Sequence, residues 1–155
     1  MAAKRNISVP IAVTYNVPLE RIGDLLVSAF EGGSTHWYFI ADTYYPAKVE
    51  FSVMGENSLC RHPADAVLNE GGYVLVRSVG ESGEIGDEIN GQTEWRLDLE
   101  ACRRALQMMA DGKWKGSDEC NRPARFWEAF INESDDAETA DVFLQLALFG
   151  EIAYG

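Results

Sequence analysis

The chain has 155 residues, of which 46% are hydrophobic and 25% are charged, which is the composition of one globular domain. It carries 25 acidic and 13 basic residues, so its formal net charge at pH 7 is −12. Such a negative charge disfavours direct binding to nucleic-acid phosphates. We therefore expect one domain over residues 1–155, with residues 1–6 disordered, and no nucleic-acid ligand.

The N-terminal pattern predicts a strand followed by a helix. Apolar residues stand at every second position of Ile7–Tyr15, and Pro10 favours a place at a sheet edge. Apolar residues then recur three and four apart over residues 18–31, which predicts a helix. Gly32 and Gly33 follow it, and a left-handed residue after a helix is most easily supplied by glycine.

The middle of the chain predicts an antiparallel sheet. Aromatic and branched residues over 36–41 predict a central strand, with residues 49–53 as its expected partner. A short helix is expected over 63–69 and a third strand over 73–76. The pair Asn90-Gly91 predicts a turn into a strand at 93–97.

Helices are predicted for the C-terminal third of the chain. Asp98 is expected to cap a helix that ends at Gly112, and aromatic residues recur at helical spacing over 123–131. A last helix is expected from Asp135 to Gly150, and its apolar residues surround the axis, which predicts a central position. Strands early and helices late indicate an α+β fold, with an antiparallel sheet of four to five strands against three to four helices.

Cysteine and hydropathy patterns suggest a reduced, cytoplasmic protein. The three cysteines, Cys60, Cys102 and Cys120, are an odd number, and no secretory leader is recognisable. The longest nearly apolar stretch, residues 142–149, is far shorter than the roughly 20 residues needed to span a bilayer. We expect no contact with a membrane.

Neither histidine lies in a pattern typical of nucleophilic catalysis, so we expect a protein that is not an enzyme and has no cofactor. The pair Cys60-x-His62, with Cys102 and Cys120, has the residue types of a zinc site, but paired C-x2-C spacing is absent and no metal is expected. Cys102 lies on the apolar face of its predicted helix, where a free cysteine packs as a small hydrophobe.

Acidic residues gather in two clusters, which have two open interpretations. A charged cluster can be a solvated face that maintains solubility, or a docking surface for the basic groove of another protein. Carboxylates on a rigid body can take the place of phosphates in such a groove. The candidate partner-binding residues are Glu81, Glu84, Asp87 and Glu88 in one loop, and Glu133, Asp135, Asp136, Glu138 and Asp141 around the start of the last helix.

A second candidate site combines the glycine turn, the aromatic strand and a basic segment. Arginine or lysine would bind the ligand phosphates and aromatic residues would line the pocket, which predicts a site for a nucleotide. The competing interpretation is that the turn only ends a helix and that the histidine is hydrogen-bonded within the sheet. The candidate pocket residues are Gly32, Gly33, His36, Trp37, Tyr38, Arg122 and Arg125.

Two segments, 29–38 (AFEGGSTHWY) and 136–155 (DAETADVFLQLALFGEIAYG), resemble a group of small phage- and prophage-borne proteins of uncharacterised role. The resemblance implies a mobile-element origin and supplies no catalytic residues. A fainter similarity, to the ArdB antirestriction proteins, rests on Phe30, Gly32, Gly33, Trp37, Phe39 and Pro46.

Together these features predict a phage-encoded accessory protein that acts in the host cytoplasm. It would bind and block a host defence complex of the CRISPR or restriction type, using its acidic surface as a DNA mimic. The alternative is a sponge that sequesters a nucleotide immune signal in the aromatic and basic pocket. Self-association as a homodimer is compatible with either hypothesis.

Overall fold

The computed structural model describes residues 5–32, 36–56, 58–80 and 82–155. Its first helix, α1 (Leu19–Glu31), buries Leu25 and Leu26 and confirms the helix predicted from apolar spacing. The helix ends at Gly32, but for a different reason than expected. Gly32 has an extended backbone with a φ of −94°. A Cβ atom there would lie 2.3 Å from the carbonyl oxygen of Ser28, so close approach requires the glycine.

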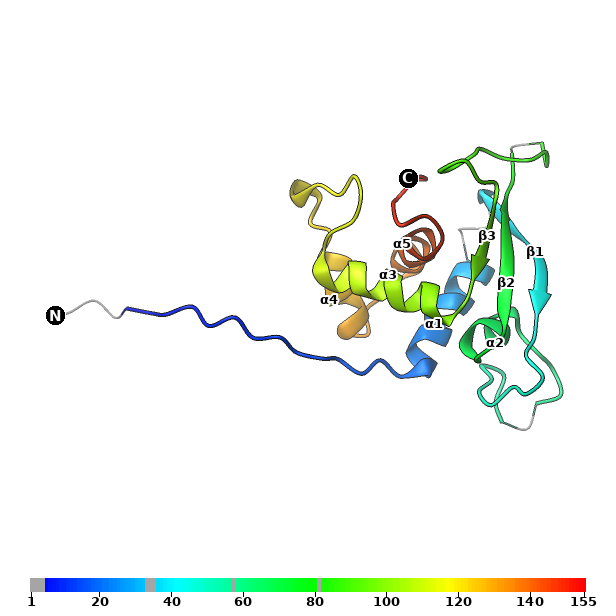
Figure 1. Cartoon of the computed structure of the whole chain (residues 1–155), viewed down its shortest axis with the longest axis horizontal. Helices are drawn as coiled ribbons and strands as arrows, with labels where there is room; N and C mark the ends of the chain where they lie inside the picture. The colour runs from blue at the N-terminus through cyan, green and yellow to red at the C-terminus, as the bar shows by residue number, and fades with distance from the viewer. Residues whose placement is uncertain (1–4, 33–35, 57, 81) are drawn as a thin grey trace.

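The sheet has three antiparallel strands in the order β1-β2-β3 (Figure 1). The strands are β1 (Tyr38–Tyr44), β2 (Tyr73–Ser78) and β3 (Glu94–Leu97). The turn before β3 has the left-handed pair Asn90-Gly91, as predicted. An antiparallel sheet is therefore confirmed, whereas the expected four to five strands are reduced to three because two predicted strands do not form.

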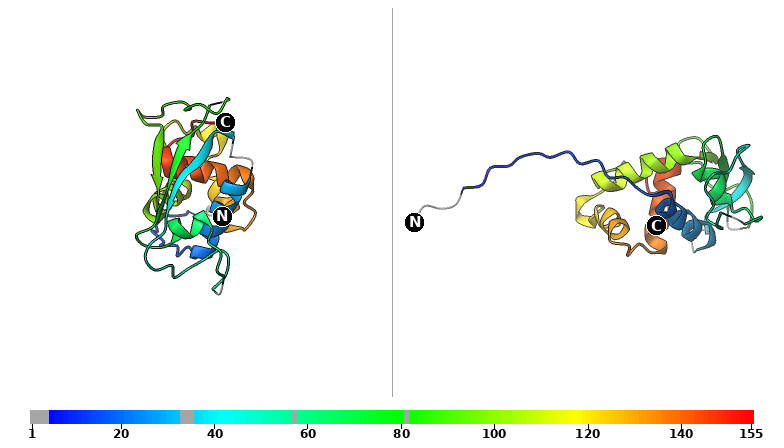
Figure 2. Two further views of the ribbon diagram at one scale, coloured as in Figure 1. Left: turned by 90° about the vertical axis from the view of Figure 1, so that its right-hand side faces the viewer. Right: turned by 90° about the horizontal axis from the view of Figure 1, so that it is seen from below.

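The first missing strand is the N-terminal segment. Residues 5–17, which we call the N-terminal arm, form neither helix nor strand and extend away from the body (Figures 1 and 2). Its apolar side chains are open to solvent, with Ile7 87% and Val13 81% exposed. The predicted edge strand is thus wrong within this chain, since alternation specifies strand-like backbone without specifying a partner.

The second missing strand is the segment 49–53, which was expected to pair with β1 and does not. Its backbone is instead bound by side chains of α2 (Pro63–Leu68) and the residue after it. The amides of residues 50 and 51 donate to Oδ1 of Asn69, at 2.8 and 3.0 Å, and the Val53 amide donates to Oδ1 of Asp65 at 2.8 Å. Asp65 is fully buried, so these bonds satisfy both its carboxylate and the loop.

The helical layer is built around α5 (Ala137–Phe149). It packs against α1, α3 (Leu99–Asp111), α4 (Arg125–Ile131) and β3, and a 3-10 turn, η2 (Glu119–Asn121), precedes α4 (Figures 1 and 2). Phe143 and Leu144 are fully buried, so the predicted central position is confirmed. The fold is α+β, with five α-helices beside the sheet in the described residues. No helix in those ranges is long and apolar enough to cross a membrane.

Candidate functional site

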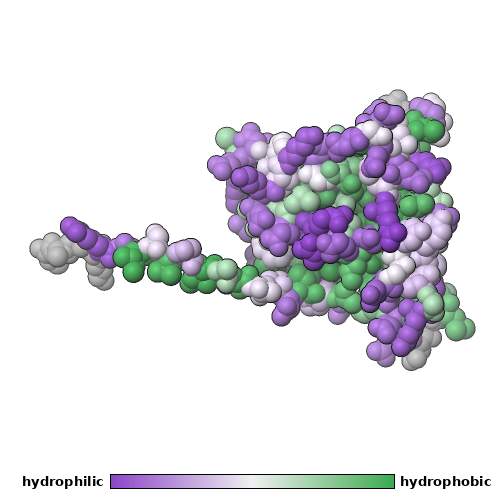
Figure 3. All heavy atoms as spheres, viewed as in Figure 1, coloured by the Kyte–Doolittle hydropathy of each residue, from purple (hydrophilic) through white to green (hydrophobic). Residues whose placement is uncertain are grey.

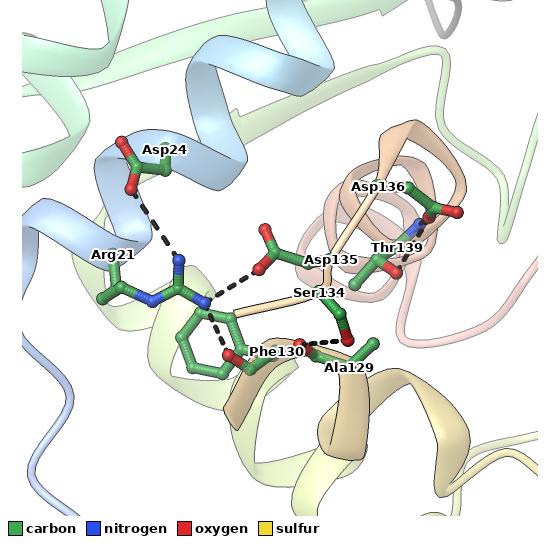
Figure 4. A network of polar contacts seen from close by, with 8 residues as sticks. All are labelled: Arg21, Asp24, Ala129, Phe130, Ser134, Asp135, Asp136 and Thr139. Atoms are coloured by element: carbon green, nitrogen blue, oxygen red, sulfur yellow. Dashed lines mark hydrogen bonds and ion pairs between the residues drawn. The ribbon is translucent and has the colours of Figure 1, made fainter. Parts of the chain in front are cut away.

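Two residues of the acidic cluster around the start of α5, Asp135 and Asp136, bind other parts of the chain (Figure 4). Asp135 binds Arg21, whose Nη2 lies 2.8 Å from the Asp135 Oδ1 atom, and the same guanidinium donates to the carbonyl oxygen of Phe130. The prediction that Asp135 caps the last helix is wrong by one residue. Asp136 caps α5, accepting from the Thr139 amide at 2.9 Å, and this bond holds the pKa of Asp136 below its ordinary value.

Asp141, also in the predicted cluster, lies on the inner side of α5. Its Oδ1 atom accepts from the indole Nε1 of Trp37 at 2.9 Å, and its Oδ2 atom accepts from Gln145 at 2.7 Å. Trp37 is only 2% exposed, so this carboxylate satisfies a buried indole donor. Asp141 therefore joins the start of the sheet to the central helix.

Gln145 fixes the C-terminal tail, residues 150–155. The Gln145 side chain is fully buried, accepts from the amides of Ala153 and Tyr154 at 2.8 Å each, and donates to the Tyr154 carbonyl oxygen at 2.9 Å. The tail is thereby held beside α5. The Tyr154 ring then stacks on Trp37, with ring centroids 5.0 Å apart and an interplanar angle of 13°.

These elements enclose a pocket of about 280 Å³ between α5, α4 and the tail, which we call the α5 pocket. Rings of Trp114, Phe126 and Tyr154 contribute to its wall. Among the described lining residues, the side chains charged at neutral pH are three carboxylates and one guanidinium, from Asp118, Glu138, Asp141 and Arg125. An aromatic wall with an excess of carboxylates suits a cationic side chain and is unfavourable for a phosphate.

The charges in the α5 pocket are already arranged around one cation. The Arg125 guanidinium lies over the Phe126 ring at 4.6 Å and pairs with Glu138 at 3.5 Å. Asp118 and Asp141 form no ion pair among the described residues. Asp118 accepts a hydrogen bond from the Cys120 amide, and Asp141 accepts from the side chains of Trp37 and Gln145. Two carboxylates thus remain without a countercation.

The first acidic cluster lies in the loop between β2 and β3. Glu84 folds back on its own loop, accepting from the Ser82 amide at 3.0 Å, while Asp87 and Glu88 are exposed. Glu81 lies outside the described residues. Burial and the negative charge of Asp87 together raise the pKa of Tyr154, so this loop acts electrostatically on the tail that borders the α5 pocket. Figure 1 shows the loop beside the C-terminus.

Basic residues elsewhere are largely neutralised by the chain's own carboxylates. The Lys and Arg side chains with a carboxylate partner in the described residues are Arg21, Lys48, Arg77, Arg96, Arg103, Lys115, Arg122 and Arg125. Glu133, the remaining member of the second cluster, is exposed and has a left-handed backbone with a φ of 56°. Pairing of the cations leaves the excess negative charge on the surface.

The members of the predicted nucleotide pocket that the structure describes are not gathered at one place. Trp37 and Tyr38 are core residues, and the Tyr38 hydroxyl donates to the Ala29 carbonyl oxygen at 2.7 Å. Arg122 is exposed and 4.0 Å from Glu128, while Arg125 borders the α5 pocket.

The glycines and His36 add no further support for that pocket. Gly32 ends α1, Gly33 lies outside the described residues, and His36 is exposed.

His62, the histidine of the Cys60-x-His62 pair, is held by local contacts at the start of α2. Its Nδ1 accepts from the Ala64 amide at 3.0 Å, and its Nε2 lies 3.0 Å from Glu31, so both ring nitrogens have partners. Within the described ranges, no group of three or more His, Cys, Asp and Glu is placed to hold a metal ion. Cys102 is buried, which raises the pKa of its thiol, whereas Cys60 and Cys120 are exposed.

Sequence reasoning missed the residues that shape the α5 pocket. Trp114, Asp118, Gln145 and Tyr154 were not among the candidates. Asp118 caps the short 3-10 turn η2. Gln145 is a polar residue within an otherwise apolar stretch of helix, and this pattern could have indicated a buried side-chain contact, because a buried amide requires hydrogen-bond partners. No family model, curated protein or solved structure matches this chain.

Proposed function

We propose that this protein is a non-catalytic inhibitor of a host defence complex, which it binds through the α5 pocket and the acidic loop beside it. The observation that carries the proposal is the α5 pocket itself, where aromatic rings and unpaired carboxylates meet at the surface of a chain of net charge −12. A basic groove of a nuclease presents arginine and lysine side chains for DNA phosphates. The pocket is suited to bind one of them.

The chemistry of recognition follows from the lining. An incoming guanidinium can lie against the ring of Trp114 or Tyr154 and donate to Asp118 or Asp141. Partial enclosure strengthens these contacts relative to an open surface, and the surrounding carboxylates increase the rate of encounter with a basic partner. The acidic surface therefore steers the partner, and the pocket fixes its position.

The excess of carboxylates also favours this function over the sponge. Among the described residues that line the α5 pocket, Arg125 is the one cation, and it already contacts the Phe126 ring and pairs with Glu138. A phosphate there would face three carboxylates and would have to break that ion pair. The pocket favours a cation over a nucleotide.

The test uses a panel of bacterial strains, each carrying one defined restriction or CRISPR system, and measures protection of an unmodified phage in each strain. The protein is expressed as wild type, as Asp118→Asn/Glu138→Gln, and as the matched control Glu56→Gln/Glu70→Gln. The control removes two exposed carboxylates at the α2 end of the molecule, away from the C-terminus (Figure 1). All three proteins are purified to compare their folding and their affinity for the purified defence complex.

We expect wild type and control to restore plating of the phage and the pocket variant to bind about tenfold or more weakly, the loss that corresponds to roughly 1.4 kcal/mol. Failure of wild type to protect against each system of the panel, at equal expression, would contradict the proposed function. Full protection by the pocket variant would be consistent with an inhibitor but would show that the α5 pocket is not its binding site.

A further inference from the structure

The N-terminal arm has the alternating sequence of a β-strand, but it pairs with no strand among the described residues. Ile7, Val9, Ile11 and Val13 are 64 to 87% exposed. Within the described ranges, the backbone of residues 5–17 makes no hydrogen bond, and the arm projects from the body as a row of apolar side chains (Figure 3). Exposed apolar alternation of this length is typical of a segment that pairs with another chain.

The sheet of the same chain is a poor acceptor for such a strand. The edge strand β1 has a bulge between Ile40 and Asp42, and Asp42 is exposed on it. The opposite edge, β3, has only four residues and carries the exposed Arg96. Bulges, charges and short length all discourage strand addition. The acceptor must therefore be another surface.

A groove lies where the arm meets the body. It has a volume of about 640 Å³ and is bordered on one side by arm residues, including Val13 and Tyr15, and on the other by Leu99, Leu106 and Trp127. Tyr15 already packs edge-on against Trp127, with ring centroids 5.7 Å apart. In Figure 3 the apolar row of the arm gives way to paler residues where the arm meets the body, and apolar surface follows on the body beyond them. One side of the groove is thus a strand-like backbone with unused hydrogen-bonding groups.

Charge complementarity identifies the occupant. Residues 1–17 contain two basic residues, Lys4 and Arg5, and no acidic one, so all 25 acidic residues lie in the rest of the chain. The arm is a basic, apolar segment, and the body is acidic. A second copy supplies both the complementary arm and an acidic body.

We propose that two copies of this chain associate by antiparallel pairing of their N-terminal arms, with Ile11 of each copy at the two-fold axis. This register places Val9 opposite Val13 and Ile7 opposite Tyr15 of the second copy. Ile7 and Val9 of each arm then lie beside the groove of the other copy, which that copy's own Val13 and Tyr15 border. A closed two-fold arrangement uses both arms and leaves no unpaired end to extend into a fibre.

The position of Pro10 fits this register. When Ile11 faces itself as a hydrogen-bonded pair, the next pair, Pro10 with Ala12, is of the kind that exchanges no hydrogen bonds. A proline is tolerated there because its missing N–H would point away from the other strand. The association is independent of the function proposed above, since the α5 pocket is formed within one chain.

The test combines molar mass with site-specific cross-linking. Light scattering and sedimentation equilibrium measure the mass of wild type and of Val9→Ser/Val13→Ser. For cross-linking, Ile11→Cys is introduced into a Cys60→Ser/Cys120→Ser background, which removes the exposed native thiols. The matched control is Ser8→Cys, because residue 8 faces Thr14 in this register and does not meet its own copy.

We expect wild type at twice the mass of one chain, a dimer dissociation constant raised about a hundredfold or more in Val9→Ser/Val13→Ser, and rapid disulfide formation with Ile11→Cys only. A monomeric wild type would overturn the proposal. So would a dimer that the double serine variant leaves intact, which would place the interface elsewhere. Equal cross-linking of both cysteine variants would reject the register.

Discussion

The ring of Tyr154 stacks on Trp37 with an interplanar angle of 13°, and so joins the C-terminal tail to the residue that precedes β1. Trp37 is buried, and Tyr154 borders the α5 pocket on its other side. The pocket wall is therefore supported by the hydrophobic core. A substitution that removes the stacking of Tyr154 on Trp37 should therefore also alter the wall of the α5 pocket.

Tyr154→Ala should weaken both folding and partner binding. Loss of the stacked pair removes about 0.5–1.5 kcal/mol beyond the buried area, and one wall of the α5 pocket disappears. Urea denaturation followed by tryptophan fluorescence measures the first effect, and affinity for the defence complex measures the second. Tyr45→Ala, an exposed tyrosine 42% accessible to solvent, is the control and should change neither.

Asp141→Asn should destabilise the protein although it is nearly isosteric. The Asp141 carboxylate accepts from two donors, Trp37 and Gln145, and an amide can accept only through its single oxygen, so one donor loses its partner. We expect the free energy of unfolding to fall by about 1–3 kcal/mol. Glu138→Gln, at an exposed position of the same helix, should change it by less than about 0.5 kcal/mol. Equal stability of the two variants would contradict the role of Asp141.

Asp136→Asn should change the acid dependence of stability more than stability at neutral pH. Bonds from the Thr139 amide and hydroxyl lower the pKa of Asp136 in the folded state. The charged cap therefore stabilises the fold above the unfolded-state pKa, and this contribution is lost as the pH falls through the folded-state pKa.

Unfolding curves at several pH values test this. The advantage of wild type over Asp136→Asn should shrink on acidification below about pH 4. Asp136→Ala, which removes the cap, should cost about 1 kcal/mol at pH 7. A difference between wild type and Asp136→Asn that stays constant over this range would exclude the linkage.

Thiol reactivity should separate the three cysteines. Cys60 and Cys120 are exposed, whereas burial raises the pKa of Cys102 and withholds its thiolate. A thiol reagent should therefore modify two cysteines in the native protein and the third only after denaturation. Rapid native modification of all three would show that α3 opens readily. In the same assay, Cys102→Ser should abolish the modification that requires denaturation and leave the other two modifications unchanged.

The sequence predicted elements whose stability is local and missed those that depend on distant partners. Helix α3 was correctly predicted because its cap, its apolar face and its terminal glycine lie within one short stretch. Residues 7–15 and 49–53 carry strand-like patterns, yet a strand also needs a neighbour, and neighbours are set by the tertiary fold. One of these segments remained an arm and the other was bound by Asn69 and Asp65.

The same distinction explains the candidate site. Charge clustering pointed to Glu138 and Asp141, which line one pocket together with Arg125, a residue predicted for the separate nucleotide pocket. It gave no indication that Asp135 and Asp136 are used by Arg21 and by the helix amides, since those contacts depend on which elements meet. It also missed Tyr154, because the tail reaches the pocket only through the buried amide of Gln145.

The side chains of Asp65 and Asn69 perform for residues 50–53 what a neighbouring strand would do for an ordinary sheet segment. They recognise backbone amides, which every residue except proline possesses. Apart from Ser52, whose hydroxyl also donates to Asp65, the loop can therefore accept many replacements in its own sequence while its path is preserved. Substitution at Asp65 or Asn69 has the opposite consequence, because a change at Asn69 releases two loop amides and a change at Asp65 releases the Val53 amide and the Ser52 hydroxyl. Variation among natural or selected variants should accordingly be concentrated in the loop and depleted at these two positions.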